Sequence, residues 1–365
     1  MKYPVYNRSF TGNEKKYVMD CLDSTWISSK GSYIEKFETS FAEYTGAAFA
    51  TSVNNGTAAL HLALMAADIS AGDEVIVPDF TYVATPNAVH YTGATVIFAD
   101  VCSHNWQIDP ADIERKITDR TKAILLVHLY GAPCDMDRIL SICKKHNLLL
   151  IEDCAEGIGT LYKGKHVGTF GDIAAFSFFG NKTITTGEGG MVISNNRQLI
   201  EKASHIKNQG VTSKVYWHDV IGYNYRMTNL CAAIGLAQLE CINEILADKI
   251  RIANVYRESF RDTCIEFHEQ EVDTQHSYWM CSILLKNSGL RDKLVNHMKK
   301  HEIDSRPLFY PCHTMPMYAD HNEIGFPVTD NLSYRGLNLP SYPELTNEDV
   351  SFIAATILKF LEENT

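Results

Sequence analysis

The residue with the clearest chemical potential is Lys182, which lies in a predicted turn between two strand-like segments. The aromatic segment 176–179 precedes it, and the glycine-rich run 187–190 and the apolar segment 191–194 follow it. A lysine held between buried strands is costly as an ammonium ion, because desolvation disfavours its charged form. Such a lysine is better suited to a Schiff base, in which a carbonyl partner replaces the ammonium group.

A carboxylate that suits this lysine ends an apolar strand upstream. The segment 148–151 consists of Leu and Ile, and Glu152 and Asp153 follow it. Pyridoxal phosphate (PLP) needs a lysine to carry its aldehyde and an acid to keep its pyridine nitrogen protonated. Lys182 and Asp153 are therefore predicted to be the catalytic pair. The alternatives are a surface position for Lys182, and a helix N-cap or loop salt bridge for Asp153.

A phosphate-binding turn is predicted at Asn55-Gly56-Thr57, directly before a helix that we expect over 57–65. Glycine lets the backbone approach a ligand closely, and a helix N-terminus presents free N–H groups with a partial positive charge. The same tripeptide is also an ordinary turn with an N-cap, so this pattern alone leaves both interpretations open.

The order of the predicted elements indicates an α/β fold. Short apolar strands alternate with helices from about residue 45, and we expect strands at 74–78, 95–100, 123–129 and 148–153. These strands are continuously apolar, which is typical of a mainly parallel sheet with helices on both faces.

The pattern changes near residue 245. One long helix is expected over 242–260, and strand 278–285 and the amphipathic helices 290–301 and 347–362 follow it. The length of 365 residues suits one large and one small domain. We therefore expect a large domain over 1–243 and a small α+β domain over 244–365.

The chain also resembles the nucleotide-sugar aminotransferases of the DegT/DnrJ/EryC1/StrS family. The resemblance covers nearly the whole length and is carried by the segments 4–6, 24–31, 151–156, 177–182, 187–190, 305–307 and 336–340. It implies the PLP-dependent fold type I of the aspartate aminotransferase superfamily, assembled as a homodimer or a dimer of dimers. It also implies PLP as the cofactor and transamination from L-glutamate as the reaction.

The resemblance assigns cofactor contacts residue by residue. Lys182 would carry the cofactor and move the proton during the reaction, and Asp153 would face the pyridine nitrogen. The other implied contacts are Gly56, Thr57 and Ser177 at the phosphate, Tyr82 stacked on the ring, Glu156 near the phenolic oxygen, and Asn224 reaching the phosphate in the neighbouring subunit.

Two of these assignments have plain structural alternatives. Tyr82 could be a core aromatic, and Glu156 could be a capping or solvent-facing residue. Relatives often carry a small hydroxyl residue where this chain has Asp79, so the loop after strand 74–78 departs from the family pattern.

The substrate side of the site is implied by resemblance as well. Arg306 could pair bidentately with a phosphate or with the donor carboxylate. The full set of implied substrate contacts is Trp26, Ser28, Lys30, Arg306 and His313.

The uninterrupted stretch 177–185, together with 223–228 and 305–307, is most similar to the branch that aminates C4 of GDP-4-keto-6-deoxy-D-mannose. That branch forms a perosamine-type product for surface polysaccharide, such as the O-antigen of lipopolysaccharide. A dTDP- or UDP-linked keto sugar is the alternative substrate, because the residues that would read the base cannot be located in the sequence.

Two other classes of function were weighed. Sugar dehydratases of this family carry histidine in place of the cofactor-bound lysine, so Lys182 argues against dehydration. A non-enzymatic protein on the same fold would not need the combination of Asp153, Ser177, Lys182 and Asn224.

Composition narrows the partners and the compartment. The net charge is −11, which argues against nucleic acid or an anionic membrane. No apolar run approaches the ~20 residues of a membrane span, and the first residues lack the apolar core of a signal peptide. The ten cysteines form no Cys-x-x-Cys pair, so we expect reduced thiols in a cytoplasmic protein.

A metal site is not expected. His297 and His301 have the i, i+4 spacing that places two imidazoles on one helical face. Zinc usually needs three or four protein ligands, and no third candidate is evident, so a solvated helix face is the preferred interpretation.

Overall fold

A seven-stranded sheet forms the centre of the computed structural model, which describes residues 1–8, 10–321 and 325–364. Its strands lie in the order β1 (Phe49–Val53), β9 (Gly190–Ser194), β8 (Ile173–Ser177), β5 (Leu149–Asp153), β4 (Thr121–Val127), β2 (Glu74–Pro78) and β3 (Thr95–Ala99). Neighbouring strands from β8 to β3 are parallel, whereas β9 runs antiparallel to both β8 and β1. The predicted mainly parallel sheet is confirmed.

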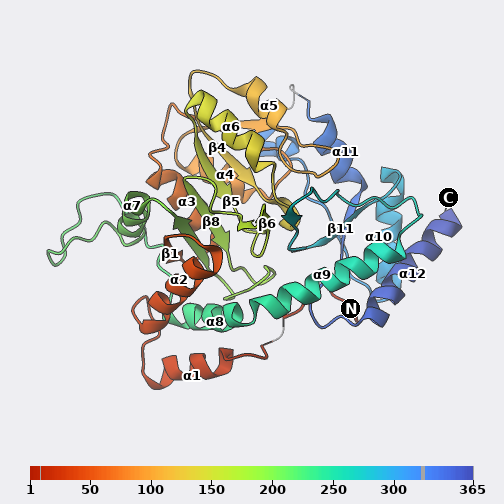
Figure 1. Cartoon of the computed structure of the whole chain (residues 1–365), viewed down its shortest axis with the longest axis horizontal. Coiled ribbons are helices and arrows are strands. Elements are labelled where there is room, and N and C mark those ends of the chain that lie inside the picture. Colours follow the sequence, from red (N-terminus) through yellow and green to blue (C-terminus); the bar gives the residue numbers. More distant parts are fainter. Residues whose placement is uncertain (9, 322–324, 365) are drawn as a thin grey trace.

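Helices cover both faces of this sheet (Figure 1). One face packs against α3 (Gly56–Ala66), α4 (Ala84–Tyr91) and α7 (Arg197–Lys207). The other face packs against α5 (Pro110–Lys116), α6 (Met136–His146), α2 (Ser32–Thr45) and α8 (Asn229–Glu240). Helix α1 (Glu14–Asp23) packs against α8. Successive residues of one strand enter different clusters, and this is why the strands are apolar at every position.

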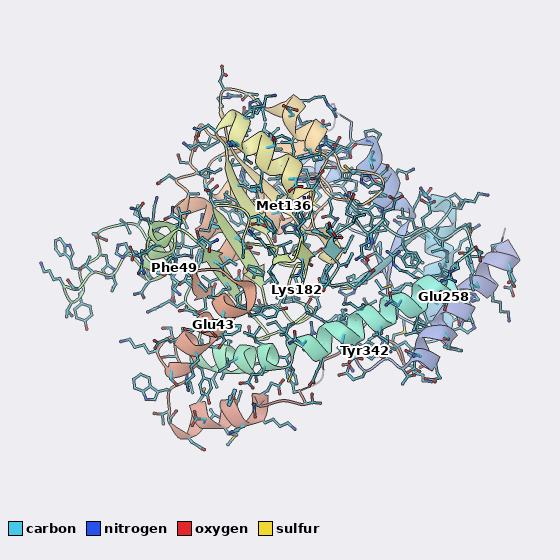
Figure 2. All side chains as sticks on the ribbon, viewed as in Figure 1. Glu43, Phe49, Met136, Lys182, Glu258 and Tyr342 are labelled. Atoms are coloured by element: carbon cyan, nitrogen blue, oxygen red, sulfur yellow. The ribbon has the colours of Figure 1, made fainter. Side chains whose placement is uncertain are left out.

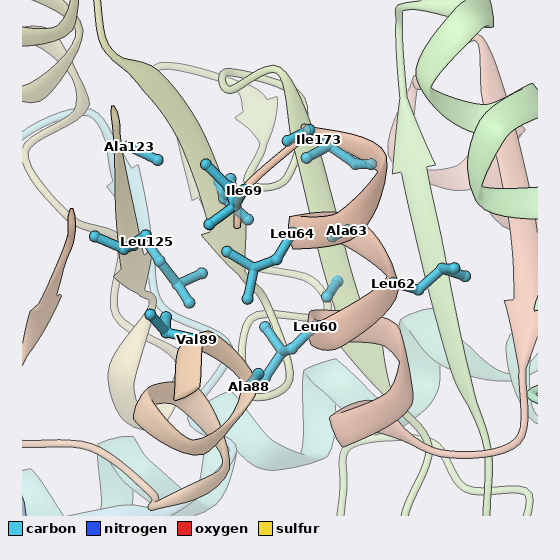
Figure 3. Close-up of a cluster of buried hydrophobic side chains, with 14 of the residues drawn as sticks. Leu60, Leu62, Ala63, Leu64, Ile69, Ala88, Val89, Ala123, Leu125 and Ile173 are labelled. Carbon is cyan, nitrogen blue, oxygen red and sulfur yellow. The ribbon is translucent and has the colours of Figure 1, made fainter. Parts of the chain in front are cut away.

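Helix α3 is an example of how a helix packs against the sheet. Leu60 and Leu64 point toward Val89 of α4 and Leu125 of β4, whereas Leu62 points to the other side of the helix (Figure 3). A helix that is apolar all round has to be buried all round. The N-terminus of α3 is therefore held firmly against the end of the sheet.

A second cluster of buried side chains lies at the C-terminal end of the long helix α9 (Ile242–Ser259). It includes residues of α10 (Arg291–Lys300) and α12 (Asn347–Asn364), and of an antiparallel sheet with the order β11 (Cys281–Leu284), β13 (Gly336–Leu339) and β12 (Arg306–Pro307). Helix α9 starts beside α8 and ends in this second cluster, as the expected helix 242–260 would (Figure 1). The domain boundary at residue 243 stays a prediction.

The remaining elements are short. Strands β10 (Thr274–Gln275), β6 (Leu161–Tyr162) and β7 (Lys165–His166) form a small antiparallel sheet, and α11 (Pro327–Arg335) precedes β13. Among the described residues, no single helix is both long and apolar enough to cross a membrane. Helices α8 and α9 reach that length and composition only as a pair, with a 61° bend between them.

Two predicted strands are shorter than expected. The strand expected over 278–285 is confined to β11, because Tyr278 has a φ of 49°. The strand expected over 123–129 ends at Val127, because Leu129–Gly131 form a 3-10 turn. The left-handed backbone at Tyr278 cannot continue an extended strand, and Trp279 and Met280 directly after it line a cavity.

Candidate active site

A cavity of about 760 Å³ lies at the carboxyl ends of the parallel strands. Asp153 and Ser177 are the last residues of β5 and β8, and both line the cavity together with the first turn of α3. Ligands of open α/β sheets bind at this edge, because loops and helix N-termini converge there. In Figure 2, Lys182 is labelled near the middle of the molecule.

The turn that carries Lys182 is hydrogen-bonded to the residues that directly follow strand β8. The Lys182 N–H donates to the Phe179 carbonyl at 2.9 Å, and the Thr186 N–H donates to the Phe178 carbonyl at 2.9 Å. The Lys182 side chain enters the cavity and is largely buried, with its Nζ atom 3.5 Å from Glu156 Oε1. Strands β5 and β8 are neighbours, which is how Lys182 and Asp153 come to share one cavity.

Asp153 is a buried carboxylate with partners on both oxygens. Its Oδ2 accepts a hydrogen bond from the Thr85 hydroxyl at 2.8 Å, and its Oδ1 accepts one from the Ala155 N–H at 3.0 Å. Burial raises the pKa of Asp153, and these two hydrogen bonds offset the effect only in part. A protonated ring nitrogen beside Asp153 would stabilise the carboxylate form, because an opposite charge within a few ångströms favours ionisation.

Glu156 is the second buried carboxyl group of the cavity. Its Oε2 accepts a hydrogen bond from the Tyr130 N–H at 2.7 Å, and the left-handed backbone at Tyr130 aims that N–H inward. Burial raises the pKa of Glu156 to about 7, against the lowering effect of the Lys182 charge. Near neutral pH this carboxyl group can therefore either hold or release a proton.

The predicted phosphate turn has the shape of an anion cradle. Asn55 caps α3, because its Oδ1 accepts a hydrogen bond from the Ala58 N–H at 2.8 Å. A Cβ atom on Gly56 would lie 2.6 Å from Cβ of Ser177, so only glycine fits between the helix and β8. The first N–H groups of a helix lack partners inside it and favour an anion. Gly56, Thr57 and the Ser177 hydroxyl suit a phosphate group.

Aromatic and basic side chains form the rim of the cavity. Tyr82 is exposed, so the interpretation as a core aromatic is wrong, and its ring lies 5.8 Å from the ring of Phe309. Arg306 lines the cavity on strand β12, with its guanidinium 5.1 Å from the Tyr6 ring centroid. A flat exposed ring and an exposed cation at one mouth suit an anionic ligand with a planar part.

The other predicted site residues lie outside the cavity of the single chain. Trp26 and Ser28 contribute backbone carbonyls that accept hydrogen bonds from Asn229, and Lys30 is not among the lining residues. The Asn224 side chain accepts hydrogen bonds from the Arg226 guanidinium at 3.1 and 3.2 Å.

His313 is placed differently from the expectation of a substrate contact. The residue is buried, and its ring nitrogen Nδ1 lies 2.7 Å from Asp79 Oδ2. Its backbone N–H donates a hydrogen bond to Asp79 Oδ1 at 2.8 Å. Burial raises the pKa of Asp79 to about 6, although the bonds to His313 lower it. The physical reason for the difference is Asp79, whose buried carboxylate takes the imidazole as its partner.

The lining residues that were not predicted from the sequence include Thr85, Glu188, Trp279 and Asn338. Thr85 follows Tyr82 by one helical turn, and this spacing could have indicated a shared face. Trp279 and Asn338 come from segments far along the chain, and no local pattern marks them. Glu188 lies within the glycine-rich run 187–190, for which no side-chain role was predicted.

A compact group of possible metal ligands lies behind the cavity. His128, Glu152 and Cys154 are all buried and close together. The Glu152 carboxylate already accepts hydrogen bonds from His128 and from three backbone N–H groups of the loop 168–171. Its acceptor capacity is used by the protein, and we interpret the group as structural.

Comparisons with known proteins agree with this geometry. The model of the DegT/DnrJ/EryC1/StrS aminotransferase family matches residues 9–358. GDP-perosamine synthase of Escherichia coli O157:H7 is 55% identical over 365 residues, with 100% of both chains covered. GDP-perosamine synthase of Vibrio cholerae is 50% identical, with 98% of both chains covered.

Solved structures share the architecture. Helicobacter pylori PseC, an aminotransferase of pseudaminic acid biosynthesis, superposes with a TM-score of 0.94 at 26% identity, and 99% of both chains is covered. DesV of S. venezuelae superposes with a TM-score of 0.91 at 31% identity, covering 96% of this chain and 94% of the other. The predicted fold class, a PLP-dependent fold of type I, is confirmed.

Proposed function

Because the chain belongs to the DegT/DnrJ/EryC1/StrS aminotransferase family and is a PLP-dependent sugar aminotransferase, we propose that it aminates C4 of GDP-4-keto-6-deoxy-D-mannose. L-Glutamate would supply the amino group, and the product would be GDP-perosamine. The observation that carries this proposal is the full-length identity of 55%, 50% and 45% to three GDP-perosamine synthases.

The residues of the cavity fit the cofactor. PLP supplies an aldehyde that accepts the amino group and a protonated ring that takes up electrons during the reaction. Lys182 would hold the aldehyde, Asp153 the pyridine nitrogen, and Glu156 the phenolic oxygen. The cradle formed by Gly56, Thr57 and Ser177 would hold the phosphate, and Tyr82 would cover the ring.

Lys182 would also move the proton. A general base must reach the proton that it transfers, and the Lys182 side chain is the flexible amine of this cavity. Glu156 Oε1 lies 3.5 Å from Nζ, so the released lysine has a carboxyl neighbour that can exchange a proton with it. Burial of both groups excludes bulk water from this exchange.

The substrate diphosphate needs cations in an otherwise acidic protein. Arg306 lies at the cavity mouth and is the best placed candidate, because a guanidinium pairs bidentately with phosphate oxygens. Lys30, Trp26 and Ser28 would act from outside the single-chain cavity. His313 would support this side of the site through Asp79 rather than by touching the sugar.

A second copy of the chain would complete the site. Asn224 would contribute to the partner's phosphate site, because its side chain lies outside the cavity of its own chain. The loop before it exposes large apolar side chains, with Val215, Tyr216 and Ile221 at 79%, 93% and 91% exposure. Such exposed apolar side chains favour assembly into a homodimer or a dimer of dimers.

The cellular role follows from the product. A perosamine-type nucleotide sugar would serve a surface polysaccharide such as the O-antigen of lipopolysaccharide, made from a pool in the cytoplasm. A spore coat polysaccharide biosynthesis protein, SpsC of Bacillus subtilis, is 34% identical over 96% of this chain, which supports a role in polysaccharide synthesis.

The test is a panel of nucleotide-linked keto sugars incubated with the enzyme, PLP and L-glutamate. Mass spectrometry of the product should show amination of the GDP-linked 4-keto sugar with the highest kcat/KM. UDP-linked sugars belong in the panel, because a UDP-N-acetyl-3-dehydro-alpha-D-glucosamine 3-aminotransferase from Acidithiobacillus ferrooxidans is 38% identical. A higher kcat/KM with a dTDP- or UDP-linked sugar would overturn the substrate assignment, and dehydration without amination would overturn the reaction.

A further inference from the structure

The aromatic face of Trp279 lies directly against the amine of Lys182. The Nζ atom is 3.9 Å from the indole ring centroid, and Trp279 is 4% exposed. A cation this close to a desolvated indole is attracted by the negative face of the ring. Glu156 Oε1 lies 3.5 Å from the same nitrogen, so the amine has a carboxyl group and a π face as its two neighbours.

The indole ring is held in place from three directions. Its Nε1–H donates to the Asn181 carbonyl at 2.7 Å, which bonds the ring to the turn that carries Lys182. Its plane is stacked with Tyr130 at 6.1 Å and 10°, and with Phe309 at 6.4 Å and 27°. These contacts leave the ring little freedom to turn away from the lysine.

The backbone of Trp279 is anchored as well. Lys249 of α9 is buried, and its Nζ donates to the Trp279 carbonyl at 2.8 Å and to the Ser341 hydroxyl at 3.0 Å. Gly131 leaves room for this chain segment, since a Cβ atom there would lie 3.0 Å from the Trp279 nitrogen. A buried lysine and a glycine in the left-handed region therefore both act on the position of one tryptophan.

We propose that Trp279 is a further catalytic residue, whose π face holds the ammonium form of Lys182 while this lysine is not bound to the cofactor. The inference rests on the proposed role of Lys182. A lysine that is released in each turnover has to stay near the atoms between which it moves a proton. Trp279 keeps the charged amine next to Glu156 and adds no second charge to the cavity.

The test measures the reactivity of Lys182 in the full-length protein after PLP has been removed. Trinitrobenzenesulfonate reacts with the neutral amine, and peptide mapping gives the rate at Lys182 alone. The rate at pH 7 divided by the plateau rate reached at high pH, where the amine is fully neutral, gives the neutral fraction, because a change in access alters both rates equally. Trp279→Leu removes the π face, and the ratio should rise about two- to fivefold, as expected for a cation–π contact of ordinary strength.

Two further variants make the result specific. Trp279→Phe keeps a smaller π face in the same place and should give a ratio between those of wild type and Trp279→Leu; it also serves if the leucine variant does not fold. Met280→Ala enlarges the same wall of the cavity without removing an aromatic ring, and its ratio should equal that of wild type.

An unchanged ratio in folded Trp279→Leu and Trp279→Phe would overturn the proposal, and so would an equal rise in Met280→Ala. The substrate assignment is tested separately, since no sugar is present in this experiment. In the holoenzyme, Trp279→Leu should lower kcat with L-glutamate by more than it changes KM, because the residue acts on the released lysine.

Discussion

Two buried carboxyl groups share the cavity with Lys182, and burial raises the pKa of both. The hydrogen bonds of Asp153 and Glu156 differ, and so do the roles that suit them. Asp153 has partners on both oxygens and is fixed in place, which suits a permanent charge pair with a ring nitrogen. Glu156 is bound on one oxygen by the Tyr130 N–H and leaves the other near Lys182, which suits proton exchange.

Asp153→Asn should give a folded protein with strongly reduced transamination. The amide keeps the shape and can still bond to Thr85, but it cannot hold a pyridine nitrogen in the protonated form. We expect kcat to fall by about a hundred- to thousandfold, the range found when one electrostatic contact to a reaction centre is removed. Circular dichroism checks the fold, and single-turnover kinetics measure the rate of transamination. A near-wild-type rate would place the partner of the pyridine nitrogen elsewhere.

Glu156→Gln should remove a pH dependence. In wild type the carboxyl group is neutral below its pKa of about 7 and can donate to a phenolic oxygen; above that pH it becomes a carboxylate that repels it. The dissociation constant of PLP should therefore rise in wild type between about pH 6 and pH 8, and rise less in the glutamine variant. Equilibrium titration at several pH values gives both curves. Parallel curves would show that Glu156 does not titrate beside the cofactor.

At the scale of elements, the site depends on how closely α3 approaches β8. Helix α3 is buried on all sides, so its N-terminus cannot shift to accept a larger residue at position 56. The Ser177 side chain would meet any such residue directly. Phosphate binding and helix packing therefore depend on the same glycine.

Gly56→Ala should weaken PLP binding by roughly tenfold or more, because overpacking of this kind typically costs about 1–3 kcal/mol. Absorbance titration with PLP measures the loss. Gly289→Ala is the matched control, since the atom nearest to its Cβ would be a side-chain oxygen of Asn287 at 3.5 Å and its backbone needs no left-handed conformation. Equal PLP affinity in Gly56→Ala and wild type would contradict the cradle.

At the scale of the whole molecule, the active unit should contain two chains. Lys182→Ala and Asn224→Ala each disable one contribution, and a mixed dimer has one site with both residues intact. Random mixing should restore about a quarter of wild-type activity, because half of the dimers are mixed and each has one working site.

The control for this mixture is Lys182→Ala combined with the double variant Lys182→Ala/Asn224→Ala, in which no site is complete. Native mass spectrometry confirms that chains exchange. Exchange without recovered activity would mean that each site is built from one chain.

Local patterns in the sequence were enough to predict the central sheet and the two residues proposed for catalysis. Continuous apolar strands alternating with helices predicted the mainly parallel sheet, because strands covered on both faces need apolar residues at every position. The acid at the end of one strand and the lysine after a later strand predicted the chemistry. To place this acid and this lysine in one site, it was enough that both strands end at the same edge of the sheet.

The surroundings of Lys182 and Asp153 could not be predicted from the sequence, because they are formed by distant parts of the chain. Trp279 reaches Lys182 because Tyr278 turns the backbone out of the expected strand, and a left-handed φ at a non-glycine residue leaves no periodic signal. His313 is paired with Asp79, more than two hundred residues away along the chain. Contacts between distant segments depend on how buried groups satisfy one another in three dimensions, and the spacing of residues along a chain does not record that.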